Sequence, residues 1–127
     1  MKKKIIVTGY VNDIRKEYIS SCVNVAPMRF GAGTLYKIIE SIALGVPVVA
    51  TSLAVQDLSK EIKDFVFIAD SENEFVENVL SILNDPKKAR EKVKVGRKVI
   101  SDSLDLVNVV EKFENNLKTE LEKLSTI

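Results

Sequence analysis

A glycine loop, residues 31–34 (GAGT), is the part of this sequence whose residue types favour a ligand site. It lies between a β-branched run ending near Ala26 and an amphipathic stretch beginning at Thr34, where open α/β sheets bind their ligands. Gly31 and Gly33 let the backbone approach a ligand, and the first N–H groups of a following helix attract anions. A phosphate or diphosphate fits this arrangement. A glycine turn that only lets strand and helix pack is an equal alternative, since the pattern is neither a complete dinucleotide fingerprint nor a Walker loop.

Two charged residues follow the loop on the same expected helix. Lys37 lies one turn after Thr34, where it could neutralise a phosphate, and Glu40 stands on an apolar face between Ile39 and Ile42. A buried carboxylate at Glu40 would need hydrogen-bond donors. Sugar hydroxyls could supply them, and so could a protein N–H or a neighbouring lysine.

Several kinds of catalysis are excluded by composition. The 127 residues include no histidine, which removes the usual general base at neutral pH, the commonest metal ligand and every Ser/His or Cys/His pair. We therefore predict no metal site. The single cysteine, Cys22, has apolar neighbours and is expected to be a buried thiol in a reducing compartment. The apolar run 5–7 is too short for a signal peptide, so the sequence indicates a cytoplasmic protein, with peripheral contact at the inner face of a membrane as an alternative.

Charge is balanced overall and segregated locally. Lys and Arg number 19 against 18 Asp and Glu, so the net charge of +1 gives no general attraction for nucleic acid or an anionic membrane. Residues 61–85 carry one basic and seven acidic side chains, whereas residues 86–98 carry seven basic and one acidic. On a helix, the basic residues of 86–98 form one solvated face, with acidic lipid, a partner domain or phosphate as alternative contacts. Because no aromatic residue is interleaved, we expect no single-stranded nucleic acid as a partner. The face comprises Lys87, Arg90, Lys94, Arg97 and Lys98.

The elements that position these residues follow an α/β pattern. A length of 127 residues favours one domain. Short runs rich in β-branched residues predict four strands, each mostly apolar on both faces, as strands covered on both sides are. Amphipathic stretches between them predict helices on both faces of a parallel, Rossmann-like sheet. The predicted strands are residues 5–8, 23–26, 47–51 and 65–69.

The predicted helices in the first half have local start and stop signals. The first begins after Asn12 or Asp13 and buries Ile14, Tyr18 and Ile19. The second spans residues 34–44, with Gly45 at the position after its end where a positive φ costs least.

Three further helices follow in the second half. Ser71 and Glu74 form a capping-box pattern, and Asp85-Pro86 ends that helix and starts the next. A long helix over about 106–124 carries one apolar stripe that must be covered by the sheet domain or by a partner segment, with a short coiled coil as an alternative. The stripe comprises Val110, Phe113, Leu117, Leu121 and Leu124.

Three ordered motifs resemble a known family. Residues 7–13 (VTGYVND), 20–34 (SSCVNVAPMRFGAGT) and 37–51 (KIIESIALGVPVVAT) look like the C-terminal domain of retaining, nucleotide-sugar-dependent glycosyltransferases of the GT-B fold, in the group-1 or family-4-type branch. The resemblance continues weakly through residues 67–70 (FIAD) and the helix at 84–86. Most of the chain is therefore covered.

The resemblance implies a donor site. Similar enzymes hold a nucleoside-diphosphate sugar on this domain and use no further cofactor, while a separate Rossmann-like domain presents the acceptor for polysaccharide or glycolipid synthesis. Glu40 matches the glutamate that binds the ribose hydroxyls, the backbone of Gly33, Thr34 and Leu35 matches the helix start under the diphosphate, and Tyr10-Val11 matches the loop beside the nucleobase. Amide donors and the helix dipole would stabilise the departing nucleoside diphosphate.

The chain also departs from the family pattern. A second glutamate that contacts the donor sugar is replaced by Ala32, so Arg29 or Lys37 is expected to take over part of its task. The family domain opens with two strand–helix units that precede the first motif, so we expect residues 1–127 to form a single partial domain, inactive alone. The alternative is a non-enzymatic nucleotide-binding or interaction module that docks on a partner subunit.

In the family's sheet, the strands of those two units lie beside the strands that correspond to residues 5–8 and 23–26, so we expect a gap in the sheet without them. We predict that strand 5–8 pairs directly with strand 23–26, or that a second copy of the chain covers the exposed edge. The expected partners are a nucleotide sugar, an acceptor-domain segment or partner subunit, and a homodimer formed through the sheet edge or the C-terminal helix.

Overall fold

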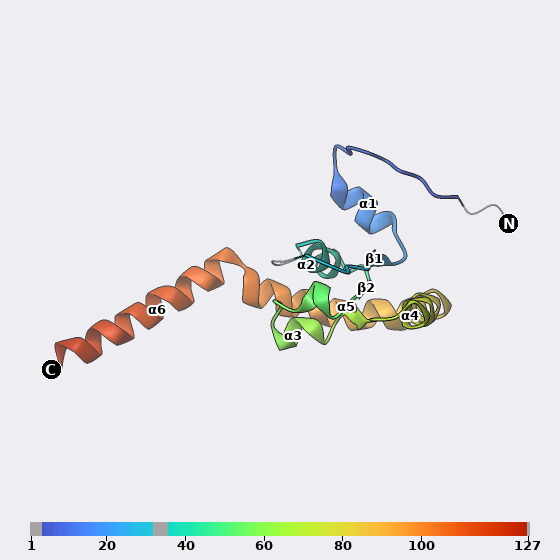
Figure 1. Ribbon diagram of the computed structural model, residues 1–127. Coiled ribbons are helices and arrows are strands. Elements are labelled where there is room, and N and C mark those ends of the chain that lie inside the picture. Colours follow the sequence, from blue (N-terminus) through green and yellow to red (C-terminus); the bar gives the residue numbers. More distant parts are fainter. Residues whose placement is uncertain (1–3, 32–35, 127) are drawn as a thin grey trace.

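The computed structural model describes residues 4–31 and 36–126 and has an α/β fold (Figure 1). Strands β1 (Asn24–Ala26), β2 (Val48–Ala50) and β3 (Phe67–Ile68) form a parallel sheet in the order β1-β2-β3. The register places Val25 beside Val49 and Val49 beside Phe67. The predicted Rossmann-like parallel sheet is confirmed, with three strands in the described chain where we predicted four.

Helices pack on both faces of this sheet. On one face, Val48 packs in a core cluster with Ile38 and Ile42 of α2 and Val93 of α5. On the other face, Val49 packs with Ile82 of α4. The helical segments are α1 (Ile14–Ser20), α2 (Tyr36–Ala43), the 3-10 turn η1 (Leu53–Val55), α3 (Lys60–Lys63), α4 (Glu72–Asn84), α5 (Pro86–Leu104) and α6 (Leu106–Ser125).

The prediction of a first strand at residues 5–8 is wrong. These residues form no strand, and the side chains of Ile5 and Val7 are 86% and 90% exposed. In Figure 1 the segment runs past α1 and away from the sheet. β-Branched residues favour a strand only where a neighbouring strand supplies hydrogen bonds and packing, and residues 5–8 do not reach β1. The predicted direct pairing with β1 is therefore absent from the described chain, and Val25 of β1 stays 53% exposed.

The first helix forms where predicted, but it buries no residue. Asp13 is its N-cap, because Asp13 Oδ1 accepts a hydrogen bond of 3.1 Å from Arg15 N. Ile14 and Ile19 remain exposed, contrary to the prediction, since α1 lies beside α2 instead of on a face of the sheet (Figure 1). Cys22, in the loop between α1 and β1, is also exposed, so the expectation of a buried thiol is wrong.

The other predicted helix ends are confirmed by their capping geometry. Gly45 ends α2 with φ at +76°, in the left-handed region that favours glycine. Ser71 Oγ accepts from Glu74 N at 3.3 Å while the Glu74 carboxylate accepts from Ser71 N at 2.9 Å, which completes the capping box of α4. Asp85 caps α5, which begins at Pro86. These ends fix α2, α4 and α5 around the sheet.

The two last helices differ in how they are covered. The face of α5 that includes Ala89, Val93 and Ile100 is buried, and the five basic residues predicted to form its solvated face are exposed. By contrast, α6 leads away from the sheet, and it buries no residue (Figure 1). Its predicted apolar stripe is present but exposed, so docking of that stripe on the sheet domain is not observed. Among the helices in the described ranges, none is long and apolar enough to cross a membrane.

Candidate functional site

The loops that follow the three strands meet around a hollow of about 260 Å³. Its walls come from the segment after β1, the residue after β2, the segment that joins β3 to α4, and the first turn of α4. Open α/β sheets bind ligands at this end of their strands. The lining residues are Pro27, Arg29, Thr51, Asp70, Ser71, Glu72 and Phe75.

The loop after β1 is held by Thr51, the residue after β2. Thr51 Oγ1 donates a hydrogen bond of 2.8 Å to the carbonyl oxygen of Met28 and accepts one of 3.3 Å from Ala54 N. Gly31 has φ at +139°, a conformation that L side chains rarely adopt. Gly31 therefore marks a turn that requires glycine, and Ala32, Gly33, Thr34 and Leu35 lie outside the described residues.

Two carboxylates flank this hollow. Asp70 accepts hydrogen bonds from Ser52 N at 2.8 Å and from the Ser52 hydroxyl, and these bonds lower the pKa of Asp70. Glu72 lies 3.8 Å from Arg29 Nη2, and both side chains are exposed, so this ion pair adds little stability. An anion bound here would compete with Glu72 for Arg29. No local sequence pattern indicates this pairing, because Arg29 and Glu72 are far apart in the chain.

Glu40 lies on α2 and does not line this hollow; its side chain contacts Tyr18. The Glu40 side chain is exposed, so its carboxylate does not depend on buried hydrogen-bond donors. Tyr18 Oη donates to Glu40 Oε2 at 3.3 Å, so a protein hydroxyl supplies the donor. Partial burial, together with the negative charge of Glu40, raises the pKa of Tyr18. A hollow of about 210 Å³ lies beside this pair, and it is lined by Ile14, Arg15, Tyr18, Glu40, Ala43 and Leu44.

Lys37 lies on α2 one turn before Glu40 and is exposed. With Tyr18 it lines a smaller hollow of about 130 Å³ beside β1, where the other lining residues are Asn24, Val25 and Ala26 of β1 and Val48 of β2. The structure therefore brings Tyr18, Lys37 and Glu40 together along one side of α2. Of these three residues, Tyr18 was predicted to be buried by the first helix and was not predicted to be a site residue.

Tyr10 and Val11 lie in the segment before α1. The Tyr10 side chain is 90% exposed, and Val11 is partly buried. Neither residue lines the hollows beside Glu40 and Lys37, and their place beside a nucleobase stays a prediction.

A buried hydrogen-bond chain holds α2 on the sheet. The Ser41 side chain is fully buried, and its hydroxyl donates to the Val46 carbonyl oxygen at 2.8 Å. Asn24 Nδ2 of β1 in turn donates to Ser41 Oγ at 2.8 Å. Because Ser41 follows Glu40 directly, this chain fixes the side of α2 that Glu40 and Lys37 occupy relative to β1.

No metal centre is formed by the described side chains. Within residues 4–31 and 36–126, no group of three or more His, Cys, Asp and Glu residues could hold a metal ion. The hydrogen-bonding groups of the site are carboxylates, hydroxyls, a lysine and an arginine, which suit a polar organic ligand.

A comparison with protein families assigns most of the chain. The family model for glycosyl transferases group 1 matches residues 1–85, which include all three strands and the helices from α1 to α4. No curated protein and no solved structure matches the chain. The matched region is more than half of the sequence and contains every candidate donor-site residue, so this chain belongs to the group 1 glycosyl transferases.

Proposed function

We propose that this chain binds the nucleoside-diphosphate sugar donor of a glycosyl transfer reaction. The observation that supports this proposal best is Glu40, an exposed carboxylate next to a hollow and engaged by one tyrosine hydroxyl at 3.3 Å. A hydrogen bond of that length at an exposed site is weak, so a ligand hydroxyl can replace it or join it. Ribose offers two adjacent hydroxyls to such an acceptor.

The proposed contacts with the diphosphate lie toward the start of α2. The helix rises about 1.5 Å per residue, so Glu40 lies about 6 Å along the axis from Tyr36, and a nucleoside diphosphate can reach from the ribose contact toward the helix start. There the backbone of Gly33, Thr34 and Leu35 would bind the diphosphate, with Lys37 and Arg29 adding positive charge. Tyr10 and Val11 would approach the nucleobase if the segment before α1 closes over the site.

Catalytic assistance in this proposal is electrostatic. Amide donors and the positive end of the α2 dipole would stabilise the negative charge that develops on the departing nucleoside diphosphate. Transfer also requires an acceptor, which the resemblance assigns to a separate Rossmann-like domain. The 127-residue chain by itself is therefore proposed to bind the donor without transferring its sugar.

Calorimetric titration of the chain with UDP, GDP, ADP and CDP tests the donor site. We expect at least one of them to bind, and Glu40→Gln to weaken that binding about tenfold or more, because a hydrogen bond to a charged group contributes about 1.5–3 kcal/mol. Glu77→Gln is the matched control, since it removes the same charge from an exposed position on α4. Absence of binding by all four nucleotides, or equal weakening by both variants, would refute the proposal.

A second function is favoured by the exposed apolar surfaces. The α6 stripe and Val25 at the β1 edge leave apolar side chains uncovered, as an interaction module that docks on a partner subunit would. If this module is the main function, the chain should bind none of the nucleotides and should co-purify with a partner that carries a Rossmann-like acceptor domain. Nucleotide binding by the chain in the absence of such a partner would favour the donor-binding function instead.

A further inference from the structure

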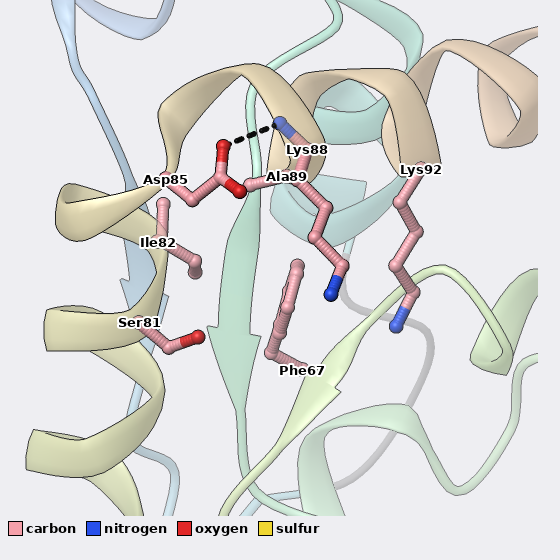
Figure 2. A pocket seen from close by; sticks show the side chains of 7 residues that line it. All are labelled: Phe67, Ser81, Ile82, Asp85, Lys88, Ala89 and Lys92. Atoms are coloured by element: carbon pink, nitrogen blue, oxygen red, sulfur yellow. Dashed lines mark hydrogen bonds between the residues drawn. The ribbon is translucent and has the colours of Figure 1, made fainter.

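A hollow of about 380 Å³ lies away from the donor-site residues, between β3, the end of α4 and the first turns of α5 (Figure 2). It shares no lining residue with the hollows beside Glu40 and Arg29. Its chemistry is therefore separate from that of the proposed donor site.

The floor of this hollow is apolar. Phe67 of β3 turns its ring into the space, while Ile82 of α4 and Ala89 of α5 lie around it (Figure 2). Ile82 and Ala89 are 1% and 5% exposed and belong to the core cluster on this face of the sheet. Because the floor is part of that core, its shape is set before any ligand arrives.

Two ammonium groups lie beside the same floor. Lys88 and Lys92 stand four residues apart on α5, and Figure 2 shows both side chains extending toward Phe67. Lys92 Nζ lies 4.3 Å from the centroid of the Phe67 ring. Partial burial lowers the pKa of Lys92, and the charge of Asp64 opposes that shift. Neither lysine is in a salt bridge within the described part of the chain.

The polar groups at the rim limit the charge of a ligand. Asp85 Oδ1 accepts a hydrogen bond of 3.1 Å from Lys88 N, so this carboxylate is engaged as the N-cap of α5. The Ser81 hydroxyl also lines the hollow. Two lysines and one aspartate give the lining a net charge of +1, which one negative charge on a ligand would balance.

We propose that this hollow is a binding site for a small organic monoanion with a flat apolar body. The body lies against Phe67, Ile82 and Ala89, and the anionic group lies between the ammonium groups of Lys88 and Lys92. Burying an apolar ring releases water from both surfaces, and charge-assisted hydrogen bonds to the lysines orient the ligand.

Titration of the ¹⁵N-labelled chain with 2-naphthoate, followed by NMR, tests this site. We expect saturable shifts at the backbone amides of Phe67, Lys88 and Lys92. The neutral amide, 2-naphthamide, keeps the ring and removes the charge, so it should bind about tenfold more weakly. Lys88→Gln and Lys92→Gln should each weaken naphthoate binding by a similar factor.

Lys87→Gln and Lys94→Gln are the matched controls, since they remove the same charge from exposed positions on α5 that do not line the hollow. Both should bind naphthoate as the unaltered chain does. Equal binding of the amide would show an apolar surface without anion selectivity, and equal weakening by the control variants would show general attraction to the basic helix. Either result, or the absence of saturable shifts, overturns the proposal. Amide peak dispersion shows whether each variant is folded, and nucleotide titration of the same samples tests the donor site independently.

Discussion

Gly96 is the position where helix propensity and packing predict opposite effects of one substitution. It lies inside α5, on the buried face that packs against Phe65. In Gly96→Ala, the new Cβ would lie 2.6 Å from Phe65 Cγ and 2.9 Å from both Phe65 Cβ and Cδ2. Carbon atoms normally pack about 3.5–4.0 Å apart, so Phe65 or α5 must move.

The sign of the effect depends on whether Phe65 can yield. Replacing a helical glycine by alanine gains about 1 kcal/mol from helix propensity, whereas an overpacked methyl group costs about 1–3 kcal/mol. Rotation of the Phe65 side chain about its Cα–Cβ bond moves Cγ and Cδ2 but leaves Cβ in place, because Cβ is attached to the backbone. We therefore expect the upper part of that cost and a net loss of about 1–2 kcal/mol in the free energy of unfolding.

Urea unfolding followed by circular dichroism measures this difference. The midpoint should fall for Gly96→Ala with an unchanged m value, and it should rise slightly for Ser101→Ala, an exposed control in the same helix. In a Phe65→Ala background two of the three close contacts disappear, so the cost of Gly96→Ala should shrink. A midpoint that rises in Gly96→Ala would show that the packing argument is wrong.

Three other predictions concern the α4 cap, the Asp70 carboxylate and α6. Ser71→Ala removes the acceptor of Glu74 N and should lower the free energy of unfolding by about 1 kcal/mol in the same urea assay, and an unchanged midpoint would contradict the capping role. The folded-state pKa of Asp70 lies below its ordinary value of 3.8, so its contribution to stability is present above that pH and is lost as the pH falls through the lower folded value. Ser52→Ala removes the hydroxyl donor and keeps the backbone N–H, so it should reduce this acid dependence in thermal unfolding scans, and an identical pH profile would count against the Ser52 hydroxyl as its cause. For α6, we expect concentration-dependent self-association in light scattering that Leu117→Lys abolishes and Thr119→Lys leaves intact; a chain that is monomeric at all concentrations would refute it.

The helices that could be predicted from sequence are those with local end signals. Ser71, Asp85 and Gly45 act on atoms within a few residues of themselves, so their roles are visible in the sequence and reappear in the hydrogen bonds. The apolar spacing of α5 and α6 likewise predicts which side of each helix is apolar. It does not reveal whether that side is covered, and only the α5 face is buried.

Features that depend on distant residues were not predictable in this way. Residues 5–8 have the composition of a strand, but a strand exists only where a neighbour pairs with it, and β1 does not pair with them. Glu40 could be selected as a candidate because it lies on the helix that follows the glycine loop. Its partner Tyr18 could not, because the two residues are brought together by the path of the chain between α1 and α2.

Tyr18 lies at both surfaces on which the two proposed functions depend, namely the hollow beside Glu40 and the uncovered side of β1. Tyr18 lines the hollow beside Glu40 and the hollow beside β1, where Val25 is exposed. A segment that fills the hollow beside β1 would contact Tyr18, and a nucleotide hydroxyl on Glu40 would replace or join the hydrogen bond from Tyr18. Two ligands that act on one side chain change each other's affinity by the same factor. If a nucleotide binds at Glu40 and a segment covers β1 as proposed, their affinities are therefore expected to be coupled through Tyr18.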